Sequence, residues 1–282
     1  MTQGVETTAD VAVQGRVAGS SFYAGMRVLP RAEREAMYAI YAFCREVDDI
    51  ADDQAGDRAD RARALDAWRA DIHSLYSGGD PGRAAYLAGP AERFSLDRLD
   101  FEAVIDGMAM DVERDIRWPV AAELDLYCDR VASAVGRLSV RIFGMEEQPG
   151  LALAHHLGRA LQLTNILRDI DEDAAIGRVY LPREPIEAAG IPIGDVWRVI
   201  GDQRIDQVCR GLAAQAREHF AESRRIMAPR QPGHLIAPKL MAAAYGTLLD
   251  RMIAAGWQPP RRRVRHNRIA LLWTMIRLRL AR

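Results

Sequence analysis

Several features that would narrow the function are scarce in this sequence. Its three cysteines, Cys44, Cys128 and Cys209, are far apart and form no CxxC pair. A disulfide framework or a cysteine-based zinc site is therefore disfavoured, and a reducing, cytoplasmic location fits best. No apolar run approaches the roughly 20 residues that a membrane-spanning helix needs. The start of the chain lacks the basic and apolar segments of a secretory signal, so we expect a disordered leader over residues 1–14.

Excess charge of either sign is also missing. The chain carries 38 basic and 39 acidic residues, for a net charge of −1, which offers no general attraction to nucleic acid. Lysine is almost absent, since Lys239 is the only one. Genome composition could explain that bias alone, although the planar fork of arginine also suits diphosphate groups. With 49% hydrophobic residues, we expect one helical domain with a large core over residues 15–282.

Alternating strand patterns and hairpin signals are nearly absent, whereas helical periodicity dominates the chain. Proline and glycine clusters divide it into segments, as at Gly78–Pro81 and Pro259-Pro260. The pattern predicts an all-α protein. The expected helices cover residues 30–53, 58–76, 95–115, 121–143, 148–173, 193–227, 235–256 and 267–280.

The first functional signal is an acidic helix that ends near Asp53. Met37, Tyr41 and Cys44 are spaced by four and three, and this apolar face continues by fours to Asp48 and Asp52. Carboxylates on a core-facing stripe are costly unless a cation neutralises them. Magnesium prefers oxygen ligands and commonly bridges one or two carboxylates to a substrate phosphate.

Two other interpretations of this helix stay open. It could be an ordinary acidic helix end, with Arg45 as a surface ion-pair partner, because short acidic patterns also match by chance. Asp49 and Asp53 repeat the spacing on a neighbouring face, where they either support the ligand shell or are solvated.

A second acidic stripe lies in the segment 161–173. Gln162, Asn165, Asp169 and Asp173 are spaced by three, four and four, which places their oxygens on one side of a helix. An amphipathic surface helix, with Arg168 screening its acids, is the alternative. We expect the intervening Asp171 and Glu172 to face solvent. Two separate DxxxD helices are what a diphosphate site needs, because metals held from opposite sides can stabilise the leaving group.

Around these motifs the sequence resembles the squalene/phytoene synthase family of head-to-head prenyltransferases, from about residue 20 to residue 257. The order and spacing of the matching segments are highly specific. They are Ser21-Phe22 before Leu29-Pro30, residues 39–45, Asp106–Asp111, Tyr127-Cys128 with Val131-Ala132 and Val135-Gly136, the second acidic motif, and Gly177–Pro182.

The resemblance implies an all-α isoprenoid synthase fold, with one helical domain around a central cavity and metal motifs at its mouth. It also implies Mg²⁺, with Mn²⁺ as a substitute, and two farnesyl diphosphate molecules as substrates. Residues 19–26, 47–53, 137–144 and 168–178 are most similar to members that make presqualene diphosphate in bacterial hopanoid and squalene biosynthesis. Many relatives have an aromatic residue at the position of Arg130, which disfavours a later rearrangement here, and NADPH is not expected.

The family pattern assigns roles to residues of this chain. The metal ligands would be Asp48, Asp52, Asn165, Asp169 and Asp173; the donors to phosphate would be Arg45, Arg168, Arg178 and Tyr180, and Ser21 and Gln162 would contact substrate. Candidates for an apolar lining are Phe22, Tyr41, Val131, Ala132, Leu138, Leu161 and Tyr245, with ordinary core packing as the alternative. His155 and His156 have no metal-spaced partner in the sequence, and Cys44 has no nearby histidine base.

The last residues form a basic stretch, 261–268, followed by an apolar one, 269–276. Such a helix could rest on an anionic membrane surface, or pack on the domain with a solvated basic face, which we favour slightly. Other functions also stay open. They are phytoene, dehydrosqualene or squalene synthesis within the family, a class I terpene cyclase, and a non-enzymatic helical adaptor.

Overall fold

The computed structural model describes residues 25–53, 56–228 and 232–265, and these ranges contain helices and no β-strand. One isolated parallel bridge joins Arg117 to Val179. The helices are α3 (Arg31–Asp52), α4 (Arg58–Ser77), α5 (Ala88–Arg93), α6 (Arg98–Glu113), α7 (Ala121–Cys128), α8 (Ala134–Ile142), α9 (Glu147–Arg168), α10 (Ile170–Ala175), α11 (Arg183–Ala188), α12 (Val196–Ile200), α13 (Ile205–Met227) and α14 (Ile236–Ala255), with a 3₁₀ segment η1 (Gly82–Leu87) and a π-helical turn η2 (Asp129–Ser133). The all-α prediction is confirmed.

Two long helices predicted from the sequence are interrupted. The predicted helix 193–227 is wrong, because α12 ends at Ile200 and α13 begins at Ile205. Between them the carboxylate of Asp202 accepts the backbone N–H of Arg204, which holds a turn. The predicted helix 148–173 divides at Asp169, whose φ of −107° and ψ of 19° end α9 before α10 starts.

Some predictions fall on other parts of the chain. The leader over residues 1–14 and the helix over 267–280 lie outside the described residues, so peripheral membrane contact stays a prediction. Within the described ranges, no helix is both long and apolar enough to cross a membrane.

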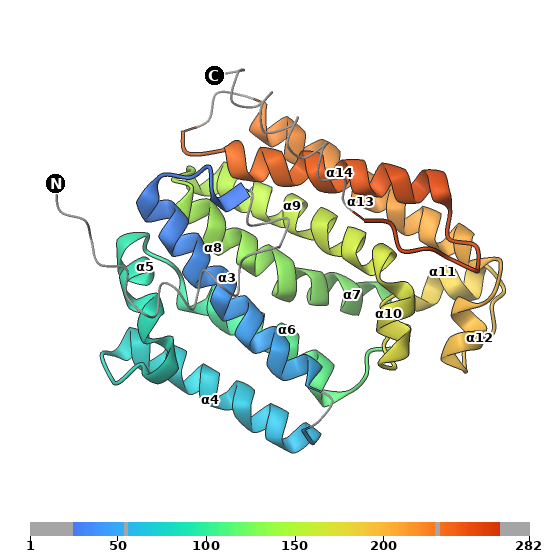
Figure 1. Cartoon of the computed structure of the whole chain (residues 1–282), viewed down its shortest axis with the longest axis horizontal. Helices are drawn as coiled ribbons and strands as arrows, with labels where there is room; N and C mark the ends of the chain where they lie inside the picture. Colours follow the sequence, from blue (N-terminus) through green and yellow to red (C-terminus); the bar gives the residue numbers. More distant parts are fainter. Residues whose placement is uncertain (1–24, 54–55, 229–231, 266–282) are drawn as a thin grey trace.

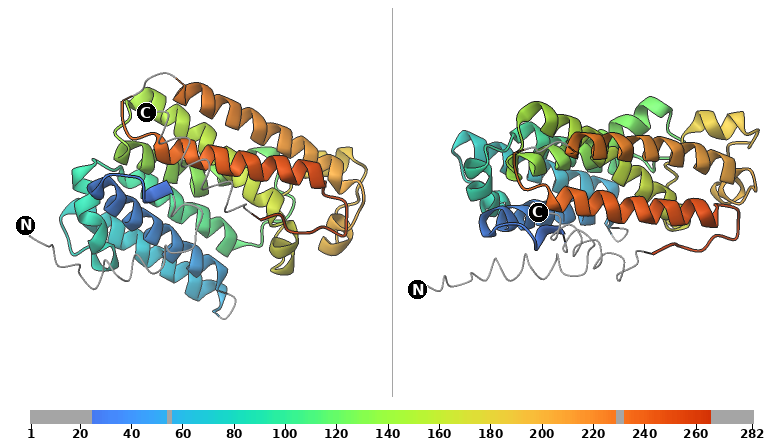
Figure 2. Two further views of the ribbon diagram at one scale, coloured as in Figure 1. Left: turned by 45° about the horizontal axis from the view of Figure 1, so that its top comes forward. Right: turned by 90° about the horizontal axis from the view of Figure 1, so that it is seen from above.

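The bundle is organised around α9. This helix runs between α8 on one side and α13 with α14 on the other (Figure 1). One apolar core gathers around α9, α13 and α14, and a second forms where α3, α4, α6 and α8 meet. Figure 2 shows these helices from two further directions. Val131 and Met145 pack against both cores. The space between the two sets of helices is therefore where a cavity can open.

Glycines allow the helices to approach closely beside that space. A Cβ atom on Gly158 of α9 would lie 2.8 Å from the backbone of Ser133 in η2. A Cβ atom on Gly107 of α6 would lie 2.6 Å from the side chain of Val131. A side chain at either position would push η2 away from its neighbours.

Candidate active site

An apolar cavity with a volume of about 310 Å³ lies between α3, α6, η2, α8, α9 and α14. Its walls include Met37, Met108, Val135 and Leu157, and they gain polar groups from α3 and α9. The cavity is lined by many of the residues predicted from the sequence: Tyr41, Arg45, Asp48, Val131, Ala132, Leu161, Gln162 and Asn165. A largely apolar space of this kind can shelter a reactive hydrocarbon from water.

The structure places the other predicted lining residues elsewhere. Leu138 is fully buried in the core shared by α3, α6 and α8, and Tyr245 is buried in the core around α9 and α13. Neither residue lines the cavity, because each side chain points into the packing between helices. Ser21 and Phe22 lie outside the described residues, so their contacts with substrate stay predictions.

Helix α3 presents its acids to the cavity through its packing. Ile40, Phe43 and Val47 are completely buried, and the Phe43 ring packs edge-on to Trp68 of α4 at 5.4 Å between centroids. The stripe of Met37, Tyr41 and Cys44 was expected to be the core face. It faces the cavity instead, about 100° around the helix from the most deeply buried side chains. Asp48 therefore lies beside open space rather than in packed core.

The first acidic motif is crowded. Burial raises the pKa of Asp48 to about 6, with a further contribution from the nearby carboxylate of Asp52. Arg45 opposes this shift, since its guanidinium donates to Asp48 at 2.6 Å and to Asp49 at 2.8 Å. One arginine thus serves two carboxylates on this helix, and the motif keeps an excess of negative charge.

The second motif lies close to the first, beside the cavity that Asn165 lines. Burial raises the pKa of Asp173 to about 8, and Asp169, Asp111 and Asp52 add to the shift. Asp111 likewise contributes to the raised pKa of Asp48. Carboxylates from α3, α6 and the α9–α10 region therefore lie close enough to repel one another. The two predicted stripes are thus close together in space.

Asp111 is a member of this cluster that the reasoning from acidic spacing missed. It is 3% exposed and accepts hydrogen bonds from the hydroxyl groups of Tyr127 at 2.9 Å and Tyr180 at 2.7 Å. The two tyrosine rings stack with their centroids 4.8 Å apart. The sequence offered one signal for this residue, because Asp111 is the only charged residue in the apolar run that follows Gly107 up to Val112. Tyr180, predicted as a phosphate donor, has its hydroxyl engaged by Asp111.

Arg178 ties the second motif to the end of α3. It is 4% exposed, and its guanidinium donates to the Asp52 carboxylate at 2.5 Å and to the Ala51 carbonyl at 2.9 Å. Its Nε lies 3.8 Å from an Asp111 oxygen. The turn at Gly177, with a φ of +84°, directs the chain so that Arg178 can reach across.

Arginines also contact the second motif from outside. Asp169 accepts from Arg168 at 2.8 Å and from Arg263 at 2.6 Å. Asp171 and Glu172, predicted to face solvent, are each 46% exposed at the side chain, and arginines of the segment after α14 also contact them. Arg261 donates to Asp171 at 2.5 Å, and Arg263 lies 3.3 Å from Glu172.

Arg130 does not face the cavity, although the argument from the sequence assumed that a side chain at this position could shield a carbocation there. Its guanidinium lies 3.9 Å from the Asp106 carboxylate of α6, and it does not line the cavity. A side chain pointing in this direction could not shield a cation in that cavity, so the inference drawn from Arg130 about rearrangement loses its support.

The polar residues at this end of the cavity fit a hard divalent cation. The Asn165 side-chain oxygen is buried and has no hydrogen-bond partner among the described residues. It lines the same cavity as Asp48. A buried oxygen without a donor and a set of mutually repelling carboxylates are the ligand chemistry that Mg²⁺ prefers.

Comparison with known proteins gives consistent matches. A family model described as squalene/phytoene synthase matches residues 16–270. A presqualene diphosphate synthase of Zymomonas mobilis is 64% identical, over 93% of this chain and 89% of the relative, and one of Rhodopseudomonas palustris is 52% identical, over 94% and 96%. A squalene synthase structure from Alicyclobacillus acidocaldarius superimposes with a TM-score of 0.75 at 28% identity, over 88% of this chain and 97% of that one.

Proposed function

This chain belongs to the squalene/phytoene synthase family, and we propose that it joins two farnesyl diphosphates head to head to give presqualene diphosphate. One allylic carbon–oxygen bond breaks and releases diphosphate. The 2,3-double bond of the second molecule then attacks the farnesyl cation, and loss of a proton closes a cyclopropane ring. The second diphosphate stays on the product, so no reductant is consumed.

The observation that supports this proposal is that Asp48 of the first motif and Asn165 of the second line one apolar cavity, with further acids of both motifs close by. Asp48, Asp52, Asn165, Asp169 and Asp173 would hold Mg²⁺. Bound there, the cation would neutralise the charge that develops on the leaving diphosphate. Asp48 and Asp52 come from α3, and Asn165, Asp169 and Asp173 come from α9, α10 and the junction between them, which supports a grip on diphosphate by two separate segments.

The cationic side chains have separate tasks in this proposal. Arg45 lines the cavity and Arg168 flanks Asp169, so both can donate to phosphate oxygens once substrate is bound. Arg178 is committed to Asp52 and Ala51, and it positions the acids of α3 rather than offering a free fork. Gln162 lines the same cavity and can contact substrate.

The cavity itself protects the reaction. Tyr41, Val131, Ala132 and Leu161 contribute to the largely apolar lining of the cavity, so a farnesyl cation bound there would be captured by the second isoprenyl chain rather than by water. The buried Asp111 and its two tyrosines hold α6, α7 and the segment after α10 together.

The test is incubation of the purified protein with farnesyl diphosphate and Mg²⁺ in the absence of NADPH, followed by mass and structural analysis of the product. The proposal expects presqualene diphosphate with one diphosphate released per product. Geranylgeranyl diphosphate, offered in a parallel reaction, should be a poorer substrate. A hydrocarbon product, or a cyclic product with a single isoprenyl chain, would overturn the proposed activity.

A further inference from the structure

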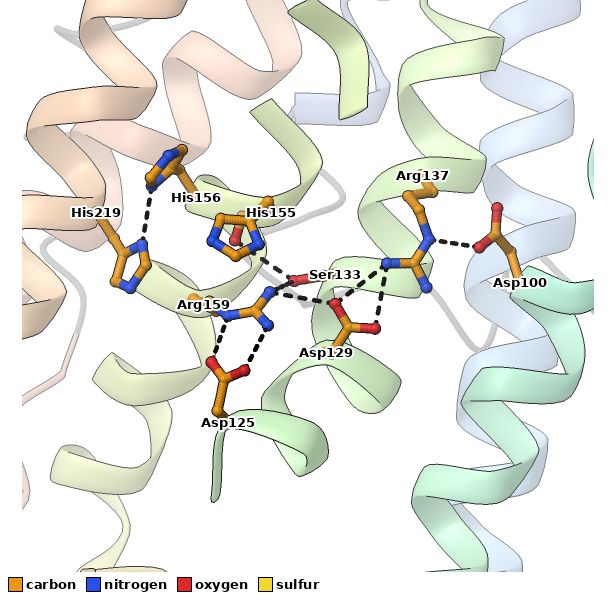
Figure 3. Close-up of polar contacts among 9 residues, drawn as sticks. All are labelled: Asp100, Asp125, Asp129, Ser133, Arg137, His155, His156, Arg159 and His219. Atoms are coloured by element: carbon orange, nitrogen blue, oxygen red, sulfur yellow. Dashed lines mark hydrogen bonds and ion pairs between the residues drawn. The ribbon is translucent and has the colours of Figure 1, made fainter. Parts of the chain in front are cut away.

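Three histidines meet on the side of α9 that faces α13. His155 and His156 are neighbours on α9, and His219 comes from α13 (Figure 3). One ring nitrogen from each lies within 4.8 Å of the others. The sequence places no metal-spaced partner near the histidine pair. The packing of α9 against α13 supplies that partner from 63 residues away.

The geometry is close to that of a ligand set. The Nδ1 atoms of His156 and His219 are 3.0 Å apart, and the three ring centroids are separated by 4.8, 5.1 and 5.8 Å. Zinc binds imidazole nitrogen at about 2.0–2.1 Å, so two nitrogens on one tetrahedral ion lie about 3.3 Å apart. Small rotations about the side-chain bonds of the histidines would bring all three nitrogens to that separation.

The surroundings of His155 and His219 favour the neutral form of each ring, which leaves a nitrogen lone pair on each available to a metal. Burial lowers the pKa of His219 to about 4, and the other two histidines and Arg159 lower it further. Burial and the Arg159 charge also lower the pKa of His155. Arg159 itself is bound by Asp125 at 2.7 Å and by Asp129 at 3.2 Å, so carboxylates offset its charge beside the cluster (Figure 3).

We propose that His155, His156 and His219 bind one transition-metal ion of the Zn²⁺ class, with a solvent molecule as the fourth ligand. His155 is exposed, which leaves room for that solvent ligand. Imidazole selects Zn²⁺ over Mg²⁺, which prefers oxygen.

The site is separate from the cavity, because α9 lines the cavity with Ala154, Leu157 and Leu161 instead. A metal ion at the histidines would join α9, which carries Asn165, to α13.

The experiment uses the full chain, without an affinity tag and freed of metal by a chelator that is then removed. Excess Mg²⁺ is present throughout to saturate the carboxylates at the cavity. Zn²⁺ is titrated by calorimetry and by thermal unfolding. We expect one Zn²⁺ per chain and a rise in Tm of more than about 3 °C at saturation. Co²⁺ should give the intense visible absorption of a four-coordinate ion.

Matched variants separate this site from other Zn²⁺ binding. His219→Gln and His156→Gln should weaken Zn²⁺ binding at least about 10-fold and abolish the rise in Tm. His73→Gln, which changes an exposed histidine on α4, should leave both unchanged. His155→Gln alters only the exposed member, so it tests the site even if a more buried variant fails to fold. Absence of stoichiometric Zn²⁺ binding, or equal binding by wild type and His155→Gln, would overturn the proposal.

Discussion

Two clusters of aspartate and arginine lie between the helices of this protein, and they differ in how completely their charges are matched. At the end of the cavity, carboxylates of α3, α6 and α10 crowd one another, and the pKa values of Asp48 and Asp173 rise to about 6 and about 8. In the network of Figure 3, Arg159 holds Asp125 and Asp129, and Arg137 holds Asp100 at 2.5 Å. Hydrogen bonds from Arg159 lower the pKa of Asp125.

This difference separates buried charges that stabilise the fold by pairing with one another from buried charges that a bound cation would neutralise. The network residues satisfy one another, so they stabilise the junction of α7, η2, α8 and α9 without any added ion. The cavity acids keep an excess of negative charge, which the fold tolerates because a bound cation would neutralise it. Even Asp100, whose pKa is raised by burial, has Arg137 opposing that shift.

The largest expected effect comes from removing acids at the cavity. Asp48→Asn and Asp169→Asn should each lower kcat/KM by at least about 100-fold, because each removes a ligand that stabilises the leaving diphosphate. Asp48→Asn should not reduce the free energy of unfolding in metal-free buffer, since a charge that is repelled by neighbouring carboxylates is lost. Steady-state assays and urea unfolding would measure both quantities. Asp66→Asn, at an exposed site on α4, is the control and should leave turnover unchanged.

Substitution in the network around Arg159 should have the opposite effect, with a loss of stability and little loss of activity. Arg159→Met removes the guanidinium that satisfies Asp125, Asp129 and the buried Ser133 hydroxyl, so it should cost about 2 kcal/mol of unfolding free energy. Its kcat/KM at a permissive temperature should stay within about 3-fold of wild type. If instead activity fell as far as in Asp48→Asn while stability held, the division between the two clusters would be wrong.

In metal-free protein, the contributions of the two clusters to the unfolding free energy should depend on pH in opposite ways. A raised pKa means that folded Asp173 binds more protons than the unfolded chain, so its contribution to stability is present at low pH and is lost as pH rises from about 4 to about 8. The lowered pKa of Asp125 reverses the sign, and its contribution is lost as pH falls below about 4.

Unfolding free energies measured from pH 3 to pH 8 would reveal both slopes. Asp173→Asn should flatten the decline between pH 5 and pH 8, by up to about 1.4 kcal/mol for each pH unit. Asp125→Asn should flatten only the acid side. An unchanged slope above pH 5 in Asp173→Asn would show that this carboxyl group is not crowded in the folded protein.

The smallest effect is expected at the rim of the first motif. Asp49 shares Arg45 with Asp48, but its side chain is 64% exposed and points to solvent. Asp49→Asn should therefore change kcat/KM by less than about 3-fold. A loss comparable to that of Asp48→Asn, in the same assay, would place Asp49 among the functional ligands and widen the site.

The local spacing of the acids could be predicted from the sequence because the helical period alone sets which side chains share a face. Asp48 lies on the cavity side of α3, and Asn165 on that of α9, as those stripes predict. The break of α9 at Asp169 was missed, since no proline or glycine marks it. It depends on tertiary contacts such as those of Arg168 and Arg263 with the Asp169 carboxylate.

Contacts between distant helices were harder to predict. Asp111 meets the acids of α3 only through the packing of α6, and its tyrosine partners follow 16 and 69 residues later. His219 reaches the histidine pair of α9 only because α13 packs there. The resemblance to a family supplied what spacing could not, and family membership removes the adaptor and terpene cyclase alternatives.

The central claim is that the cavity acids and a divalent cation together grip diphosphate, and thermal unfolding with Mg²⁺ and inorganic pyrophosphate tests it most directly. The account predicts that the two ligands together raise the Tm of wild type by more than either alone, and that an Asp48→Asn/Asp169→Asn double variant shows no such joint rise. An equal joint rise in the double variant, or none in wild type, would contradict the account.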